Sequence, residues 1–137
     1  MDNHRSHCPV NLAVEIFGDK WSLLIIRDIM FEGKRHFREM LQSEEKIATN
    51  ILTDWLAMLE QMGIITKRPD PEHKQKQIYS LTEKAIDLVP VFASIGEWSI
   101  KHLPVDTEKY VHASQLARAN KRFIAHLKKT LMKEHVI

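Results

Sequence analysis

The chain has 137 residues, of which 44% are hydrophobic and 28% charged, and its formal net charge is +2. These values predict one globular domain with enough apolar side chains to form a core. No apolar run approaches the roughly 20 residues that a transmembrane helix needs, so a membrane-spanning protein is excluded. The segment MDNHRSHCPVNLA lacks the apolar core of a signal peptide, and the single cysteine, Cys8, rules out an internal disulfide framework. Both features favour a cytoplasmic location.

Glycines and helical periodicity predict three helices in the N-terminal part of the chain. The first spans residues 9–17 and ends at Gly18. The second opens at Asp19, whose carboxylate can accept backbone N–H groups of the first turn, and it ends at Gly33, where a positive φ is suitable. A short third helix is expected over residues 37–41.

A longer amphipathic helix is expected from Ile47 to Met62, after a polar turn, with Gly63 as its stop. The side chains expected on its buried face are Ile51, Leu52, Leu56, Leu59 and Met62. Two β-prone runs follow at residues 64–65 and 78–81, joined by a polar, charged loop. Helix, turn, helix and two-stranded ribbon form the order of a winged helix-turn-helix, which places one helix in a DNA groove and a hairpin beside it.

Two further helices are expected at the C-terminal end. Thr82 is predicted to cap a helix that continues to residue 102, with a kink near Pro90. A last amphipathic helix is predicted from about Glu108 to Lys133. Its expected apolar stripe is Ala113, Leu116, Ala117, Asn120, Phe123, Ile124, Leu127 and Leu131. Three interpretations of this helix remain: it packs on the preceding helix or on a partner subunit, its basic face attracts DNA, or, least favoured, it lies on a membrane surface.

The predicted fold class is therefore mainly α with a small β-hairpin. Residues 1–137 form a single winged-helix domain with flanking dimerisation helices, and residues 106–137 are its C-terminal helical extension. The helix after Thr82 carries Leu88, Val89, Phe92, Ile95 and Trp98. Together with the first and last helices, this is more apolar surface than one small domain covers, which predicts a homodimer.

Candidate DNA contacts divide by chemistry. Thr49, Asn50 and Thr53 share a polar face at the start of the helix from Ile47, where Asn can pair with adenine and a Thr methyl can meet a thymine methyl. The alternative is that Thr49 or Asn50 caps this helix, since Ala48 cannot. Basic side chains of the third helix and the hairpin are expected to bind phosphates: Lys34, Arg35, Arg38, Lys67, Arg68, Lys74 and Lys76. For each of these the alternative is a solvated surface charge.

The acidic side chains near this helix would oppose DNA binding. Glu44 and Glu45 precede it and would repel phosphate if they faced it, so they are expected to turn away. Trp55 is expected in the core or at a dimer contact, with an exposed ring against a sugar as the alternative.

Several short motifs together resemble the HxlR-type transcription regulators, a branch of the winged-helix proteins. The similar pieces, over about residues 8–102, are Cys8-Pro9, Gly18-Asp19-Lys20-Trp21, Arg35-His36-Phe37, Ile47 to Leu52 with Leu56, Leu59, Glu60 and Gly63, Tyr79-Ser80-Leu81-Thr82, and Trp98. The resemblance implies a homodimeric regulator that binds double-stranded DNA, and no cofactor is predicted. Some members sense oxidants or electrophiles through the cysteine that Cys8 matches. The chain departs from the family at Trp55, where a basic residue is usual, and at Ala85, where glycine is usual.

Cys8 has two interpretations. A lone cysteine is commonly a small buried hydrophobe. However, Cys8 lies near a helix start, beside His4, Arg5 and His7, and such surroundings stabilise a thiolate. Any disulfide would join it to Cys8 of another subunit or to a small thiol. His4, His7 and Cys8 provide too few ligands for a metal site, so no metal is predicted.

No catalytic motif is present in the sequence: it has no G-x-S-x-G, P-loop, H-E-x-x-H or EF-hand pattern. The chain is therefore predicted not to be an enzyme, and the sequence identifies no small-molecule effector. The alternative to a DNA-binding regulator is a winged-helix module that binds proteins and has no DNA partner. The basic hairpin favours DNA, whereas the acidic balance of the helix from Ile47 favours the alternative.

Overall fold

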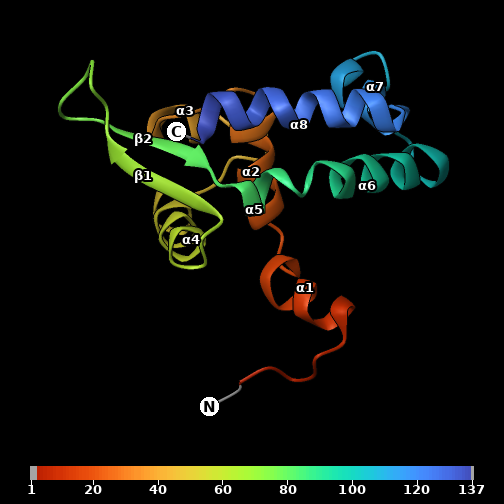
Figure 1. Cartoon of the computed structure of the whole chain (residues 1–137), viewed down its shortest axis with the longest axis horizontal. Coiled ribbons are helices and arrows are strands. Elements are labelled where there is room, and N and C mark those ends of the chain that lie inside the picture. The colour runs from red at the N-terminus through yellow and green to blue at the C-terminus, as the bar shows by residue number, and fades with distance from the viewer. Residues whose placement is uncertain (1–2, 137) are drawn as a thin grey trace. The chain divides into compact units, whose positions relative to one another are not determined.

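The computed structural model describes residues 3–136 and divides the chain into two compact units, one up to Ser80 and one from Leu81. Figure 1 shows the elements in chain order. The first unit contains α1 (Pro9–Phe17), α2 (Ser22–Met30), α3 (Phe37–Met40), α4 (Thr49–Gln61), β1 (Ile65–Pro69) and β2 (Gln77–Leu81), whose last residue begins the second unit. The second contains α5 (Glu83–Ile86), α6 (Val89–His102), α7 (Val111–Ala117) and α8 (Lys121–His135). This is the predicted mainly helical, winged-helix fold with one hairpin.

The buried side chains of the first unit come mainly from α2 and α4, with smaller contributions from β1 and β2. Ile26 of α2 and Leu52 and Leu59 of α4 are fully buried, and Ile64 and Ile65 at the start of β1 are 1% exposed. Each such aliphatic side chain contributes about 1.5–3 kcal/mol relative to an exposed one. Leu52, Leu56 and Leu59 confirm the expected apolar face of α4, although Ile51, Trp55 and Met62 are only half-buried.

Asp19 and the two glycines act at helix ends as predicted, but the N-cap residue of α2 is Trp21 and not Asp19. The Asp19 carboxylate accepts the backbone N–H groups of Trp21 and Ser22 at 2.7 and 2.8 Å. The helix itself begins at Ser22, three residues later than expected, because Asp19 lies before the first helical turn. Gly33 and Gly63 adopt φ of 67° and 74°, the left-handed conformation that ends a helix at little cost only for glycine.

The predicted capping role of Thr49 or Asn50 is wrong. Ala48 is the residue that precedes α4, its backbone is extended, and no side chain caps the helix. Thr49 and Asn50 instead occupy the first turn, so their side chains project outward and not back onto the helix start. The α4 N–H groups at this end are therefore left for solvent or a ligand.

Each of the two helices predicted for the C-terminal end is broken in the structure. The first becomes α5 and α6, with Thr82 confirmed as the cap of α5 through a 3.4 Å hydrogen bond from the Ala85 N–H. Pro90 lies in the first turn of α6, where its missing N–H leaves no bond unmade, so the chain breaks before it and no kink is needed. The second becomes α7 and α8, because the Asn120 side chain accepts the Phe123 N–H at 2.9 Å and caps α8. The prediction that Asn120 lies on the apolar stripe is therefore wrong.

The second unit is held together by small residues and one buried histidine. A Cβ atom on Gly96 of α6 would lie 3.2 Å from the Cβ atom of Ala117 in α7, so glycine permits this close approach. The His135 side chain is 6% exposed and accepts the Leu81 N–H at 3.1 Å. Lys128 of α8 pairs with Asp87 at 2.9 Å. These contacts place α8 against the beginning of the unit. Of the predicted apolar stripe, Leu131 is buried at 3% exposed, whereas Phe123 is 49% exposed and Ala113 is exposed.

Candidate nucleic-acid interface

The start of α4 is an exposed polar surface. Thr49, Asn50 and Thr53 are all exposed, as expected for residues that reach a ligand. The Thr53 hydroxyl donates to the Thr49 carbonyl at 2.9 Å, which leaves its oxygen lone pairs to accept. The Asn50 amide makes no hydrogen bond with any other residue of the described chain, so both its donor and its acceptor are available. This is the chemistry that a base edge requires.

Glu45, in the turn before α4, is held by an ion pair with α2. The Glu45 carboxylate accepts two hydrogen bonds from the Arg27 guanidinium, at 2.7 and 2.8 Å. These bonds lower the pKa of Glu45 to about 2, so the carboxylate is ionised and bound to α2. The expectation that Glu45 turns away is confirmed. Its negative charge is compensated before any phosphate approaches α4.

Two of the three basic residues expected near α3 are used inside the molecule. The Arg35 guanidinium donates to the Tyr79 carbonyl and to the Ser80 hydroxyl, both at 2.6 Å, and the Tyr79 N–H donates back to the Arg35 carbonyl at 2.8 Å. Lys34 lies 3.5 Å from the buried Asp28 carboxylate and its side chain is 20% exposed. Arg38 is the exposed one of the three and has no such bond to another described residue. Arg35 therefore attaches the start of α3 to β2, whereas Arg38 is available to a phosphate.

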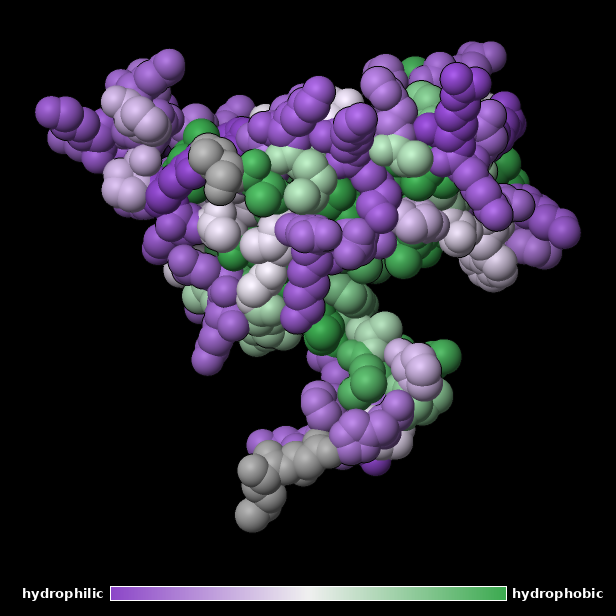
Figure 2. All heavy atoms as spheres, in the orientation of Figure 1, coloured by the Kyte–Doolittle hydropathy of each residue, from purple (hydrophilic) through white to green (hydrophobic). Residues whose placement is uncertain are grey.

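The wing, defined here as β1, β2 and the loop of residues 70–76, presents the expected basic side chains to solvent. Lys67 and Arg68 of β1 and Lys74 and Lys76 of the loop are exposed. Figure 2 shows hydrophilic side chains covering the projecting end of the wing. The loop is closed by the Asp70 N–H, which donates to the Lys76 carbonyl at 2.9 Å. Positive charge is thus carried on a short ordered hairpin.

Sequence reasoning missed one polar cluster at the base of the wing. The His36 imidazole lies between two carboxylates, with Nε2 2.7 Å from Asp70 Oδ2 and Nδ1 2.9 Å from Glu39 Oε1. His36 was visible only as part of a short motif, and Asp70 lies 34 positions away in the chain. No periodicity connects such distant residues, so nothing in the sequence pattern predicts the pair.

Cys8 is exposed at the start of α1, and the interpretation as a buried hydrophobe is wrong for this structure. The backbone N–H groups of Asn11 and Val10 lower the pKa of its thiol. The preceding segment folds back on α1, where Glu15 accepts the Arg5 N–H at 3.0 Å and contacts the His4 ring at 2.6 Å. Within residues 3–136, no three His, Cys, Asp or Glu side chains are arranged to hold a metal ion.

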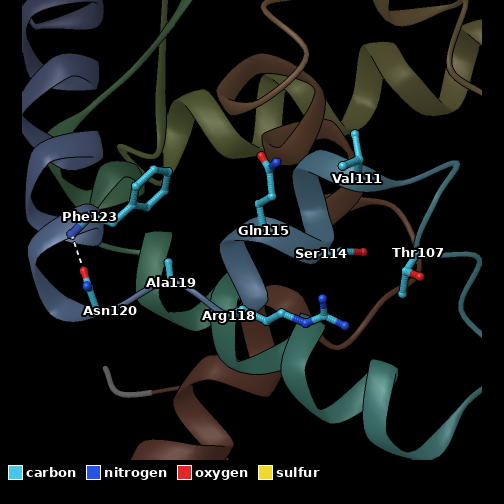
Figure 3. Close-up of a pocket in the computed structure, with 8 residues that line it drawn as sticks. All are labelled: Thr107, Val111, Ser114, Gln115, Arg118, Ala119, Asn120 and Phe123. Atoms are coloured by element: carbon cyan, nitrogen blue, oxygen red, sulfur yellow. Dashed lines mark hydrogen bonds between the residues drawn. The ribbon is translucent and has the colours of Figure 1, made fainter.

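A groove of about 740 Å³ lies in the second unit along α7 and the start of α8 (Figure 3). Its lining residues are Thr107, Val111, Ser114, Gln115, Arg118, Ala119, Asn120 and Phe123. The volume is that of a small-molecule site. However, the Ser114 hydroxyl already donates to the Tyr110 carbonyl, and Asn120 already caps α8. In Figure 3 the Arg118 side chain extends from α7 in the direction of Thr107.

The helix-turn-helix with its wing defines the class of protein as a winged-helix transcription regulator. The family model for the HxlR-like helix-turn-helix matches residues 16–107, and the chain belongs to this family. The match confirms the resemblance inferred from the short motifs. It begins after Cys8, so the correspondence of that cysteine is not part of it. Among residues 3–136, no helix is both long and apolar enough to cross a bilayer.

Several known regulators are similar to this chain. The HTH-type transcriptional regulator YodB of Bacillus subtilis is 33% identical over 93 residues, which cover 67% of this chain and 82% of YodB. The structure of reduced YodB has a TM-score of 0.59 at 30% identity and covers 71% of this chain and 95% of its own. The crystal structure of PA1607 has a TM-score of 0.67 at 33% identity, covering 74% and 70%. The oxidised redox regulator HypR has a TM-score of 0.59 at 32% identity, covering 72% and 100%.

Proposed function

We propose that this protein is a dimeric, sequence-specific DNA-binding transcription regulator in which α4 enters the major groove and the wing contacts the adjacent backbone. The observation that carries the proposal is the surface at the start of α4. It exposes Asn50 with an amide that no other described residue uses, on a helix end with no side-chain cap. The nearby Glu45 carboxylate is neutralised by Arg27. Such a helix end can receive base edges and phosphates together.

The side chains at this surface have separate roles. Asn50 can make a bidentate pair with adenine, the methyl groups of Thr49 and Thr53 can meet thymine methyl groups, and the Thr49 hydroxyl can donate to a phosphate. The exposed cations Arg38, Lys67, Arg68, Lys74 and Lys76 bind phosphates and add affinity without sequence information. Arg35 and Lys34, which the sequence placed in the same group, act through their internal bonds.

The test compares two kinds of variant on a bound genomic fragment by fluorescence anisotropy. Asn50→Ala is expected to relax sequence preference and to cost about 1–3 kcal/mol on the preferred site. Changing Lys74 and Lys76 together to Ala is expected to weaken all sequences alike and to lower the salt slope by about one per lost contact. Gln61→Ala, an exposed amide at the other end of α4, is the matched control and should change neither. The assignment fails if the lysine pair alters sequence preference while Asn50→Ala leaves it unchanged.

A homodimer is supported by apolar side chains exposed within each unit. Val10 and Val14 of α1 are 70% and 46% exposed, and Ile95 and Trp98 of α6 are 44% and 59% exposed. Such surface is normally covered by a partner. Two subunits would present two copies of α4 to half-sites about 34 Å apart. Trp98→Ser should produce a monomer in light scattering, whereas Lys101→Ser on the same helix should not; a monomeric wild type at micromolar concentration removes the proposal.

A redox role for Cys8 rests on its exposed thiol and on its place at the start of α1. The similar proteins include YodB in reduced and diamide-treated forms and HypR in reduced and oxidised forms. We infer that modification of Cys8, by a quinone or as a disulfide with a second Cys8 or a small thiol, changes DNA affinity. Wild type and Cys8→Ser are compared before and after mild quinone treatment, with mass spectrometry of the thiol. Full affinity of a protein modified at Cys8 excludes the switch.

The second candidate, a protein-binding module without a DNA partner, is favoured by the exposed acidic side chains of α4, Asp54 and Glu60. A gel shift with genomic fragments at two salt concentrations separates the two functions. Salt-sensitive binding supports the DNA regulator. No shift at low salt supports the protein module.

A further inference from the structure

The base of the wing is joined to α3 by one imidazole. His36 precedes α3, and Asp70 is the residue that follows β1. The Nε2 atom of His36 lies 2.7 Å from the Oδ2 atom of Asp70. The side chain of Asp70 is 7% exposed and that of His36 is 25% exposed. Asp70 also organises the loop, because its N–H donates to the Lys76 carbonyl and its second carboxylate oxygen accepts the Glu72 N–H at 2.9 Å. A side chain that holds Asp70 therefore also holds the two ends of the wing loop, through the bonds of Asp70 to Glu72 and Lys76.

Both ring nitrogens of His36 face a carboxylate. Nδ1 lies 2.9 Å from Glu39 Oε1, which also accepts the backbone N–H groups of Arg35 and His36 at 3.1 and 3.0 Å. A neutral imidazole donates from one nitrogen only, so the lone pair of its unprotonated nitrogen would face a carboxylate oxygen. Only the imidazolium donates at both positions. We call the group of Glu39, His36 and Asp70 the wing bridge.

We propose that His36 is a positioning residue for DNA binding: as an imidazolium in the wing bridge it fixes the wing against α3, and loss of its proton loosens the wing and lowers DNA affinity. The inference rests on the proposed DNA-binding function. His36 and Asp70 need not touch DNA themselves. They act on DNA binding through the loop that Asp70 closes, because this loop carries the Lys74 and Lys76 ammonium groups. Placement of these cations depends on a contact at the other end of the loop.

The direction of the pH effect follows from the groups that face the ring. These are Glu39 of α3 and Asp70 after β1, with His73 of the loop acting on Asp70. Hydrogen bonds to Asp70 and then Glu39 raise the pKa of His36 above its ordinary value of 6.5. The bridge is complete below that ordinary value and is lost as pH rises through the raised pKa. A neutral ring protonated at Nε2 still donates to Asp70, so the wing loosens but does not detach. Since charge-assisted bonds are roughly twice as strong as neutral ones, we expect an affinity loss of about five-fold.

The first experiment measures affinity for a bound fragment at about pH 6 and about pH 8.5, at constant ionic strength, on both sides of the raised histidine pKa. Wild type should weaken about five-fold between these values. His36→Gln should bind weakly at both. His73→Gln removes a second imidazole from the same wing and is the matched control, so it should keep the wild-type profile. A pH profile that persists in His36→Gln and disappears in His73→Gln overturns the proposal.

Asp70→Asn separates positioning from simple charge attraction. If His36 only adds positive charge near DNA, removing the negative charge of Asp70 should strengthen binding. If His36 positions the wing through Asp70, the same change should weaken binding, because the uncharged amide oxygen of Asn accepts a weaker hydrogen bond from the imidazolium than a carboxylate does. In the double variant with His36→Gln, the loss should not exceed that of the more severe single variant. Stronger binding by Asp70→Asn overturns the proposal.

A measurement without DNA distinguishes failure of the bridge from failure of the proposed function. Histidine NMR spectra should show His36 titrating above its ordinary pKa, and the exchange rate of the Asp70 N–H should rise in His36→Gln at constant pH. If wild type binds no fragment at any pH while both signals appear, the DNA function is refuted and the bridge is structural only. If His36 titrates at or below 6.5 and Asp70 exchange is unchanged, the bridge does not exist.

Discussion

Arg27 offers the sharpest test of how the first unit is stabilised, because its guanidinium serves two carboxylates. It donates to Asp28 Oδ1 at 2.8 and 3.1 Å and to both oxygens of Glu45 at 2.7 and 2.8 Å. The Asp28 side chain is 4% exposed and its other cationic partner, Lys34, lies farther away at 3.5 Å. Arg27→Met removes the charge and keeps most of the apolar stem.

The cost of this change can be worked from its two parts. A hydrogen bond to a buried charged group is worth about 1.5–3 kcal/mol, and Lys34 can replace part of it for Asp28. Glu45 is 34% exposed, so water screens its pair and the contribution is only about 0–1 kcal/mol. The free energy of unfolding is therefore expected to fall by about 2–3 kcal/mol. Urea denaturation measures it, with Arg38→Met as the control that should lose less than about 0.5 kcal/mol.

The pH dependence of unfolding provides a second test of the ion pair between Arg27 and Glu45. Arg27 lowers the pKa of Glu45 from 4.5 to about 2. The stabilisation by this carboxylate is present above 4.5 and is lost as pH falls toward 2, so wild type should lose more stability on acidification than Arg27→Met. A loss below about 0.5 kcal/mol at neutral pH with an unchanged denaturant slope would show that solvent already replaces the guanidinium. The account of Glu45 as a compensated charge would then be wrong.

Three further changes test the core, a helix end and the wing. Leu52→Ala should reduce the free energy of unfolding by about 2–5 kcal/mol because Leu52 is fully buried, whereas Met58→Ala, at a residue 44% exposed, should cost less than about 1 kcal/mol in the same urea titration. Gly63→Ala should cost about 1 kcal/mol because its φ is 74°, and Gly63→Asn should cost less; equal stability of all three proteins contradicts this. Arg35→Lys should lower DNA affinity without changing the salt slope, since its bonds go to β2; a smaller slope would make Arg35 a phosphate ligand.

The elements of the fold followed from the sequence wherever one local signal was sufficient. Gly63 ended α4, Thr82 capped α5, and the helical spacing of apolar residues located Leu52, Leu56 and Leu59 in the core. The two long C-terminal helices were wrong for a physical reason. Apolar periodicity continues through Asn120, but the side chain of Asn120 gains more by capping a new helix than by lying on an apolar stripe. Periodicity does not show where such a break occurs.

The candidate interface was predicted only as far as residue type allows. Exposure of Asn50, Lys74 and Lys76 agrees with the prediction, but a basic side chain in a sequence does not show what it already binds. Arg35 is bound to residues 44 and 45 positions away, and His36 to one 34 positions away. Pairs of this kind are set by how α3 meets the wing, which is a property of the folded chain.

The distribution of charge explains how a protein with a formal net charge of +2 can present a usable surface to DNA. Internal bonds bring opposite charges together: Arg27 compensates Glu45, and His36 compensates Asp70 at the base of the wing. Two carboxylates, Glu45 before α4 and Asp70 at the base of the wing, are thereby paired with cationic side chains that are themselves partly buried. The cations Arg38, Lys67, Arg68, Lys74 and Lys76 remain exposed, as do the carboxylates Asp54 and Glu60 of α4 and Glu72 of the wing loop. Loss of either bridge would therefore weaken DNA binding twice, by moving an element and by releasing a carboxylate beside it.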